Sequence, residues 1–254
     1  MKALSLEKRQ KFIQEYLLEN DYADIKQLSE ILDVSEMTIR RDLKKMEEAN
    51  LLICVLGGAK SLTGSTAEER KLLHSDEKHR MAKYAASLVK KGERIFIDAS
   101  STTSLITDYL NVHAAVITNN IQVCMKLQNK EGIEVFMPGG RLRKSSMSMM
   151  GGETVRMIEQ YCADKAFLSS EAINLTYGIC DSIEEEAEVK KAMLRNSQKV
   201  YFLIDHFKFG KYAFHKVCGI NKNVELIVDK SNDKEAQEFI RQCSQSGMQV
   251  WCVD

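Results

Sequence analysis

Apolar residues recur at helical spacing through the first fifty positions of the chain. Their steps of three and four predict a helix from Ser5 to about Glu19. Asp24 is suited to cap a second, short helix, and Ser35 is suited to cap a third that ends near Asn50. The amino-terminal part of the chain is therefore expected to be a small bundle of helices.

The third predicted helix has one apolar face and one polar face. Ile39, Leu43 and Met46 follow one another at steps of four and three and are expected to point inward. The positions that then point outward, with Arg40 at the margin, are Met37, Thr38, Arg41, Lys44 and Lys45. After this helix an apolar run over residues 51–56 meets Gly57-Gly58, which predicts a strand entering a tight hairpin.

A different pattern begins near residue 76. Residues 61–75 are polar and without clear periodicity, and we interpret them as a linker. Beyond them, helical stretches alternate with seven short apolar runs, at residues 95–97, 116–118, 133–136, 166–168, 200–204, 226–228 and 250–253. Such strands separated by helices are typical of a mostly parallel sheet covered on both faces. The sequence thus predicts a helical head with a hairpin, residues 1–60, and an α/β body, residues 76–254.

Composition excludes several classes of protein. The 254 residues include 36 basic and 36 acidic side chains and are 44% hydrophobic, as in ordinary globular chains. The chain has no run of about 18 apolar residues, so no membrane helix is predicted. The first residues also lack a secretory signal, and we therefore expect a cytoplasmic protein. The seven cysteines form no C-x-x-C pair, which indicates neither a zinc site nor a disulfide framework. No glycine-rich nucleotide-binding motif is present, and neither a cofactor nor a metal is expected.

The second and third predicted helices, joined by a short turn, match the description of a helix-turn-helix. In that motif the second helix lies in the major groove, where its arginines and lysines contact phosphates or guanine edges. The hairpin at residues 52–60 would be a wing, whose glycine pair would allow the backbone to approach DNA. The candidate DNA contacts are Ser35, Met37, Thr38, Arg40, Arg41, Lys44, Lys45, Gly57 and Gly58.

A solvated helix face is the alternative interpretation of these charges. Residues 1–60 include ten basic and eleven acidic side chains, whereas nucleic-acid-binding domains are usually basic. The charge is unevenly placed, however, because four basic residues stand against two acidic ones between Glu36 and Met46. The charge pattern alone leaves both interpretations open.

Polar turns follow three of the predicted strands of the body. They consist of Asp98 with Ser100, Ser101, Thr102 and Thr103, then Thr118 with Asn119, and then Gly139 and Gly140 with Arg143. Parallel strands end at one edge of a sheet, where ligands bind, and hydroxyls beside a helix N-terminus suit an anion. Each turn alone is also a common helix cap, so the prediction of a site depends on their number.

The ten residues from Val34 to Leu43, V-S-E-M-T-I-R-R-D-L, closely resemble a segment of the DeoR family of bacterial transcriptional repressors. The resemblance continues through Gly57-Gly58-Ala59 and more loosely to about Asp229, so it covers most of the chain. It implies a winged helix-turn-helix head on a sensor body with a ribose-phosphate-isomerase-like fold. Members of the family typically repress sugar-catabolism operons and are released from DNA by a phosphorylated sugar. Operator DNA and such a sugar are therefore the expected partners.

The resemblance also extends the candidate effector site. Asp98 to Thr103 is similar to the D-A-G-T-T-T loop of the family, and the T-N and G-G-x-L-R segments match the other two turns. The added residues are Glu186 and Lys190 of an E-A-x-x-K motif, and Asp205 and Lys208 of a D-x-S-K-F-G motif. Physically, Lys190 and Lys208 could pair with a phosphate. The carboxylates of Asp98, Glu186 and Asp205 could accept hydrogen bonds from sugar hydroxyls.

The sequence departs from the family pattern in four places. Ser100 and Ser101 replace a glycine and a threonine, and His206-Phe207 takes the place of a serine. Glu171 adds a carboxylate that would weaken phosphate binding if it faced inward. Cys54-Val55-Leu56 replaces a basic or histidine-containing segment of the wing, so DNA binding is expected to depend more on the recognition helix.

These observations predict a repressor that works as a homo-oligomer, a dimer or a tetramer, because reading a palindrome or repeat needs two heads. An alternative is a sugar-phosphate isomerase-type enzyme with a helical appendage, in which Asp98, Glu186 and Lys190 supply acid–base groups. A third possibility is a repressor whose body has lost phosphate binding, as the departures in the phosphate loop and at Glu171 suggest.

Overall fold

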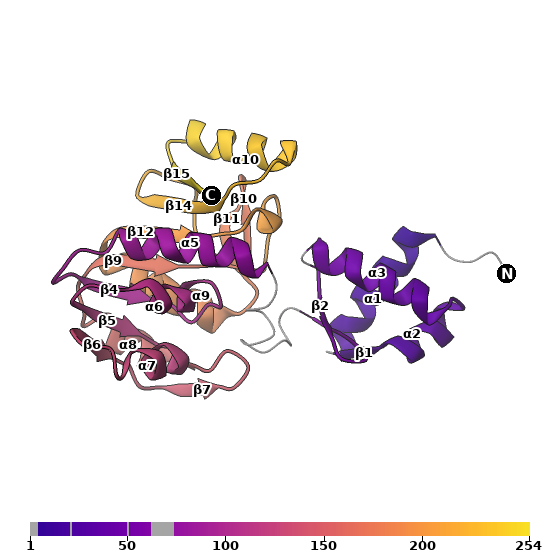
Figure 1. Cartoon of the computed structure of the whole chain (residues 1–254), viewed down its shortest axis with the longest axis horizontal. Coiled ribbons are helices and arrows are strands. Elements are labelled where there is room, and N and C mark those ends of the chain that lie inside the picture. The colour runs from indigo at the N-terminus through magenta and orange to yellow at the C-terminus, as the bar shows by residue number, and fades with distance from the viewer. Residues whose placement is uncertain (1–4, 21, 50, 62–73) are drawn as a thin grey trace. The chain divides into compact units, whose positions relative to one another are not determined.

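The chain divides into two compact units, Met1–Leu73 and His74–Asp254 (Figure 1). The computed structural model describes residues 5–20, 22–49, 51–61 and 74–254. The predicted linker therefore lies largely outside the described residues. In the part of the chain that is described, no helix combines the length and apolar character needed to cross a membrane.

In its described residues, the first unit is a head with three helices and a small sheet. Its helices are α1 (Leu6–Asn20), α2 (Ile25–Leu32) and α3 (Glu36–Glu48). Both predicted caps are present. The Asp24 carboxylate accepts the backbone N–H of Lys26 at 2.9 Å, and the Ser35 hydroxyl accepts that of Thr38 at 3.2 Å. The three predicted helices are confirmed, and α3 ends slightly earlier than expected.

The core of the head holds a charged pair among its apolar side chains. Ile39, Leu43 and Met46 of α3 are buried as predicted. Asp42 lies on the same buried face, where its Oδ2 accepts a hydrogen bond from Arg9 Nε at 2.6 Å. This ion pair ties α1 to α3. The sequence analysis did not predict it, because helical spacing does not reveal which charge finds a buried partner.

The hairpin after α3 consists of β2 (Ile53–Val55) and β3 (Gly58–Lys60), so the predicted hairpin is confirmed with a shorter first strand. A third strand, β1 (Tyr22–Asp24), pairs with β3 and gives the antiparallel order β1-β3-β2. β1 was not predicted, because three residues before a helix cap show no alternation of their own. It joins the hairpin firmly to the start of α2.

The second unit is built on a seven-stranded parallel sheet in the order β15-β14-β12-β9-β4-β5-β6. In chain order its strands are β4 (Arg94–Ile97), β5 (Ala114–Thr118), β6 (Ile133–Phe136), β9 (Ala163–Leu168), β12 (Ser197–Leu203), β14 (Val224–Asp229) and β15 (Gln249–Val253). Each strand overlaps one of the seven predicted runs. The predicted parallel sheet is therefore confirmed.

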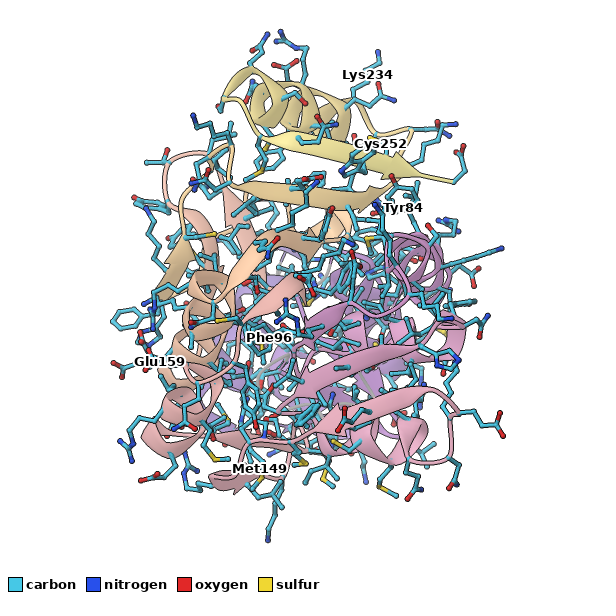
Figure 2. All side chains as sticks on the ribbon, turned by 90° about the vertical axis from the view of Figure 1, so that its left-hand side faces the viewer. Tyr84, Phe96, Met149, Glu159, Lys234 and Cys252 are labelled. Atoms are coloured by element: carbon cyan, nitrogen blue, oxygen red, sulfur yellow. The ribbon has the colours of Figure 1, made fainter. Side chains whose placement is uncertain are left out.

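Helices cover both faces of this sheet. Ile95 and Ile97 belong to one core, with residues of α5, α6 and α7, and Phe96 belongs to the other, with residues of α8, α9 and α10. The bounds are α5 (Ser75–Ser87), α6 (Ile106–Tyr109), α7 (Ile121–Leu127), α8 (Gly152–Ile158), α9 (Glu184–Arg195) and α10 (Lys234–Gln245). Figure 2 shows Phe96 among the strands and Lys234 extending outward from α10.

Two smaller β structures lie outside the main sheet. They are a hairpin of β7 (Arg141–Arg143) with β8 (Ser148–Met150), and an antiparallel sheet of β10 (Ala172–Asn174), β11 (Gly178–Asp181) and β13 (His215–Cys218). Neither was predicted, because strands of three or four residues are too short to show a period in the sequence.

The strand order reverses between β4 and β9. From β4 the chain winds outward through β5 to β6, then returns to β9 and winds the other way to β15 (Figure 1). In such sheets ligands bind at the carboxyl ends of the strands at this point, because the loops diverge there. Asp98 follows β4 and Ser169 follows β9, and the Ser169 N–H donates to Asp98 Oδ2 at 3.0 Å. The fold therefore points to the surroundings of Asp98 as the candidate site of the second unit.

Candidate functional site

The outward face of α3 is exposed, as its spacing predicts. Its exposed residues include Met37, Arg40, Arg41, Lys44 and Lys45, and the acidic Glu36 and Glu48 at the two ends of the helix are exposed as well. Arg40 lies 3.7 Å from Glu36, and such an exposed pair contributes only a few tenths of a kcal/mol. Thr38 is half-buried, and its hydroxyl lies 2.9 Å from the hydroxyl of Ser35 in the helix cap. The basic residues of this face can therefore reach a ligand without unfolding any part of the helix.

The tip of the hairpin is formed by Leu56 and Gly57. Leu56 is fully exposed, and Gly57 has a φ of +85°, a conformation that favours glycine. Gly58, by contrast, is buried, and a Cβ there would lie 2.2 Å from the Ala23 carbonyl oxygen. The close approach that Gly58 permits is thus to β1 within the head, and its contact with DNA stays a prediction.

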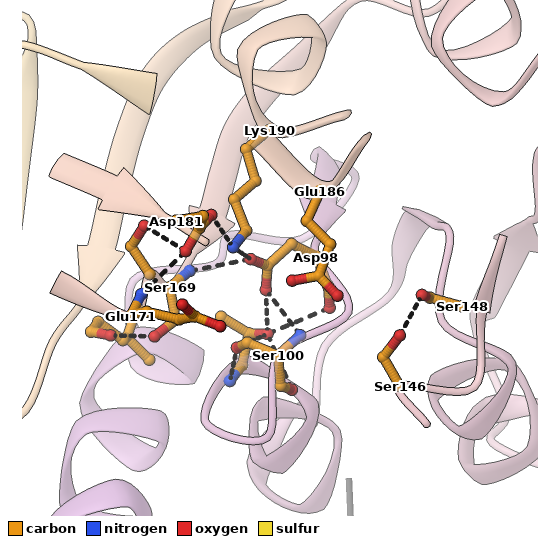
Figure 3. A network of polar contacts seen from close by, with 12 residues as sticks. Asp98, Ser100, Ser146, Ser148, Ser169, Glu171, Asp181, Glu186 and Lys190 are labelled. Carbon is orange, nitrogen blue, oxygen red and sulfur yellow. Dashed lines mark hydrogen bonds and ion pairs between the residues drawn. The ribbon is translucent and has the colours of Figure 1, made fainter. Parts of the chain in front are cut away.

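Asp98 is the centre of the polar network in Figure 3 and is only 1% exposed. Its Oδ1 accepts the Ser100 N–H at 3.2 Å and the Thr103 hydroxyl at 2.5 Å. The Ser100 hydroxyl in turn accepts the Thr103 N–H at 3.0 Å. The remaining residues of this loop are the half-buried Ser101 and the buried Thr102. The loop predicted to hold a phosphate is therefore fixed by its own hydrogen bonds.

Lys190 of α9 lies between two buried carboxylates. Its Nζ is 2.5 Å from Asp181 Oδ2 and 3.8 Å from Asp98 Oδ2. Burial alone would lower the pKa of Lys190, but Asp181, Asp98 and Glu186 together raise it above its ordinary value. Burial raises the pKa of Asp98, although Lys190 opposes this shift. Lys190 is therefore charged, and its observed contacts neutralise carboxylates.

Glu186 pairs across to β7 and not along its own helix. Its carboxylate forms an ion pair with Arg143, and both side chains are about one-fifth exposed. The neighbouring Glu185 pairs with Arg141 at 2.5 Å, in a more exposed position. Two arginines of β7 thus hold the hairpin to the first turn of α9. This contact brings the predicted effector residues Arg143 and Glu186 together.

Glu171 follows β9 and accepts hydrogen bonds from the backbone N–H and the hydroxyl of Ser182. Burial and the nearby Asp181 raise the pKa of Glu171. Figure 3 shows it beside Ser169, within the network around Lys190. The added carboxyl group therefore does face inward. The network holds four carboxyl groups, from Asp98, Glu171, Asp181 and Glu186, against the two cations Lys190 and Arg143.

Thr118 and Asn119 fix the β7–β8 hairpin to the end of β5. The Thr118 hydroxyl accepts the Asn120 N–H at 3.1 Å, and Asn119 Nδ2 donates to the Met149 carbonyl at 3.0 Å. Asn119 Oδ1 is buried and finds no hydrogen-bond partner among the described residues. This turn therefore carries an acceptor that a ligand hydroxyl could satisfy.

Gly139 and Gly140 lie where the chain passes α8. Gly140 has a φ of +145°, and a Cβ there would lie 2.1 Å from Thr154 Oγ1. The Thr154 hydroxyl donates to the Gly139 carbonyl at 2.8 Å. Packing against α8 accounts for the glycine at position 140, so this glycine by itself is no sign of a phosphate.

Asp205 and Lys208 form a separate pair after β12, where Asp205 directly precedes the short helix η2 (His206–Lys208) and Lys208 ends it. Lys208 Nζ lies 3.4 Å from Asp205 Oδ2, whereas the buried Asp205 Oδ1 finds no hydrogen-bond partner within the described ranges. Burial alone would raise the pKa of Asp205, but Lys208, Lys78 and His74 hold it below its ordinary value. The charges that surround Asp205 thus come from its own loop and from the start of α5.

The structure therefore divides the predicted effector residues into three groups at the carboxyl edge of the sheet. Asp98, with its loop, joins Lys190 in the central network, the T-N and G-G turns hold the β7–β8 hairpin, and Asp205 with Lys208 lies toward α5. Sequence reasoning missed Asp181 and Ser182, because nothing in the sequence marks the short strand β11. Over residues 5–20, 22–49, 51–61 and 74–254, no cluster of three or more His, Cys, Asp or Glu side chains suited to a metal ion is present.

Comparisons with known proteins match both units. A family model described as a DeoR-like helix-turn-helix domain matches residues 9–65, and one described as a DeoR C terminal sensor domain matches residues 73–230. The chain is 34% identical over 229 residues to the HTH-type transcriptional repressor GlcR of Bacillus subtilis, covering 88% of each chain. It is 32% identical over 221 residues to the lactose phosphotransferase system repressor of Staphylococcus aureus, covering 83% of this chain and 87% of that protein. A solved structure of ribose 5-phosphate isomerase A from Methanocaldococcus jannaschii is similar with a TM-score of 0.40 and 19% identity, over 54% of this chain and 55% of that one.

Proposed function

The chain belongs to the DeoR family of transcriptional regulators, and from this premise we propose that it represses a sugar-metabolism operon in response to a phosphorylated sugar. The observation that carries the proposal is the exposed basic face of α3 within a helix-turn-helix that matches this family. The relatives include a lactose phosphotransferase system repressor, which supports a sugar-linked operon as the target. Operator DNA is in the cytoplasm, where we therefore place the protein.

On the DNA side, α3 enters the major groove with its amino-terminal end. Arg41, Lys44 and Lys45 supply the charge for phosphates and guanine edges, and Met37 offers an apolar contact to a thymine methyl. The hairpin tip has the uncharged Leu56 where a wing usually has a cation, so it adds little to the electrostatic attraction. Most of the salt dependence of binding therefore comes from α3.

On the effector side, the sugar binds at the carboxyl edge of the sheet, beside the strand reversal. Asp205 and Asn119 each have a buried oxygen without a hydrogen-bond partner among the described residues, and such acceptors suit sugar hydroxyls. Arg143 and Lys208 are the cations that can turn from Glu186 and Asp205 to a phosphate. The Asp98 loop supplies hydroxyls and the N-terminal end of η1 (Thr103–Leu105).

Lys190 has a different role in this proposal from the one that the sequence suggested. Its ammonium group lies against Asp181 and Asp98, so it holds those carboxylates in place and does not have to leave them for a phosphate. Removing it would expose two buried negative charges to each other. Lys190 therefore shapes the site without touching the phosphate.

Control of DNA binding follows from linkage between the two sites. A sugar that binds one arrangement of the sensor more tightly shifts the population toward it, by no more than the difference in affinity. Two heads must reach two half-sites about 10 base pairs or a multiple apart, which requires a dimer or a tetramer. Release from the operator then needs only a change in how the heads are held.

A second candidate is a repressor whose effector carries no phosphate. The specific observation in its favour is the excess of carboxyl groups around Lys190, to which Glu171 contributes. An enzyme of the isomerase type is set aside, because regulators match more than four-fifths of the chain, including a helix-turn-helix that isomerisation does not need. A test must therefore separate a phosphorylated from a free sugar.

The test is fluorescence anisotropy of a labelled duplex from a promoter that the protein is first shown to bind. We expect one sugar phosphate from a panel of hexose 6-phosphates and pentose 5-phosphates to weaken binding at least about tenfold, equivalent to about 1.4 kcal/mol. The matching free sugars and inorganic phosphate serve as controls. A response to a free sugar alone supports the second candidate, and turnover of any panel member supports an enzyme.

A further inference from the structure

Phe207 lies on the loop that carries two candidate effector residues, at the place where the family resemblance leads one to expect a serine. Its ring stacks on that of His74, with centroids 3.6 Å apart and an angle of 15° between the planes. The His206 ring also contacts the Phe207 ring, with centroids 3.9 Å apart. Phe207 thus joins the effector loop to His74.

His74 is the residue at which the sensor unit meets the chain that leads to the head. It directly precedes α5 and has a φ of +52°, which is uncommon for a residue with a side chain. Its carbonyl accepts the N–H of Lys78 and so closes the first turn of α5. Its Nε2 is buried and finds no hydrogen-bond partner in the described part of the chain, so the observed contact of the ring is the stack.

The opposite side of the effector loop is held firmly. The N–H of His206 donates to Asp229 Oδ1 at 2.9 Å, and its ring Nδ1 lies 2.5 Å from Asp229 Oδ2. The N–H of Lys208 donates to the Asp205 carbonyl at 3.1 Å and makes the loop one tight turn. The turn that carries Phe207 is therefore held at Asp229 on one side and contacts His74 through the Phe207 ring on the other.

Charge reinforces the same connection. His74 and Lys78, both at the start of α5, act on the pKa of the buried Asp205 together with Lys208. Asp205 also acts on the pKa of Lys211, farther along the loop: burial lowers this pKa, and the Asp205 carboxylate opposes the shift. A change in the charge or contacts of Asp205 therefore changes the electrostatic interaction of this carboxylate with the first turn of α5.

We propose that the Phe207–His74 stack couples the effector loop to the junction between sensor and head, so that sugar binding at Asp205 and Lys208 changes how the head is held. The inference rests on the proposed function. It gives Phe207 a role as a positioning residue that contacts neither DNA nor sugar. The stack is a feature of this chain's own sequence, because a serine at position 207 could not form it.

The experiment compares full-length Phe207→Ala and Phe207→Tyr with Tyr212→Ala as the matched control. Tyr212 lies on the same segment, is 72% exposed and stacks with Tyr177 instead. Three quantities are measured for each protein: affinity for the promoter duplex, affinity for the active sugar phosphate, and duplex affinity in saturating sugar phosphate. Hydrogen exchange of the first turn of α5, including the Lys78 amide, reports the anchoring of His74 without any ligand.

We expect Phe207→Ala to keep both separate affinities within about threefold of wild type, while the sugar phosphate no longer weakens duplex binding. Exchange at the start of α5 should rise at least severalfold. Phe207→Tyr should retain the wild-type response, because its ring still stacks, and so should Tyr212→Ala. An undiminished response in Phe207→Ala, or unchanged exchange at α5, overturns the coupling. A wild-type protein that ignores every sugar phosphate overturns the proposed function instead, and the exchange data then decide separately whether the stack anchors His74.

Discussion

Replacing Lys190 with methionine should destabilise the sensor unit far more than any other single loss of charge on α9. Methionine preserves most of the volume, but it leaves Asp181 and Asp98 buried without the ammonium group that lies 2.5 Å and 3.8 Å from them. Removing one partner of a buried ion pair typically costs about 3–5 kcal/mol. We therefore expect Lys190→Met to lose about that much of the free energy of unfolding at pH 7.

The neighbouring lysine provides a matched control. Lys191 pairs with Glu188 at 2.8 Å, but these side chains are 32% and 45% exposed. Exposed pairs contribute about 0–1 kcal/mol, so Lys191→Met should cost less than about 1 kcal/mol. Both substitutions remove the same charge from the same helix. The difference between them therefore measures burial and not helix propensity.

Urea unfolding followed by tryptophan fluorescence is a suitable assay, because Trp251 is the chain's only tryptophan and lies in the sensor unit. Adding Asp181→Asn to Lys190→Met should recover part of the loss, because the strongest uncompensated charge is then removed. A cost below about 1 kcal/mol for Lys190→Met, equal to that of Lys191→Met, would refute the role assigned to this lysine.

Three further predictions concern the wing, pH and the cysteines. Gly58→Ala should destabilise the head by roughly 1–3 kcal/mol, seen as a lower Tm, because its Cβ would meet the Ala23 carbonyl; a neutral substitution would contradict the packing of β1. Burial lowers the pKa of His74 in the folded protein, so the unfolded chain binds a proton at this residue more readily. The stability linked to His74 is therefore fully present above about pH 6.5 and declines as the pH falls toward the lower pKa of the folded state. His74→Phe should flatten this part of the urea-unfolding profile, and an equal slope in both proteins would count against it. A thiol reagent at pH 8 should label the exposed Cys162 quickly, whereas Cys218, whose pKa burial raises to about 12, should react only on unfolding.

The main sheet could be predicted from the sequence because most of its inner strands are buried on both faces. Runs such as residues 95–97 and 226–228 are apolar throughout, and the helices between them show the period that covers a sheet. The short strands β1, β7, β8, β10 and β11 could not be predicted in the same way. They have only three or four residues each, and tertiary contacts decide their conformation.

The positions of the candidate site residues could be predicted better than their partners. Asp98 and Asp205 lie at strand ends, as the alternation of strands and helices requires. Lys190 was expected to face a phosphate, but it contacts Asp181, a residue nine positions away that the unpredicted β10–β11 hairpin brings beside it. The pairing of charged side chains depends on how different helices and strands pack together. The sequence pattern of a single element does not contain that information. The same reason applies to Asp42 and Arg9 in the head.

The central claim is that the cations of α3 bind DNA phosphates and bases. The most direct measurement is the affinity for the promoter duplex as a function of salt, by fluorescence anisotropy, for wild type and for Arg41→Ala with Lys45→Ala. Lys234→Ala, an exposed lysine of α10, serves as the control. Loss of two phosphate contacts should weaken binding and reduce the slope of log affinity against log salt by about 1.8, while the control keeps the wild-type slope. An unchanged affinity and an unchanged slope in the double variant would contradict the assignment of α3 as the recognition helix.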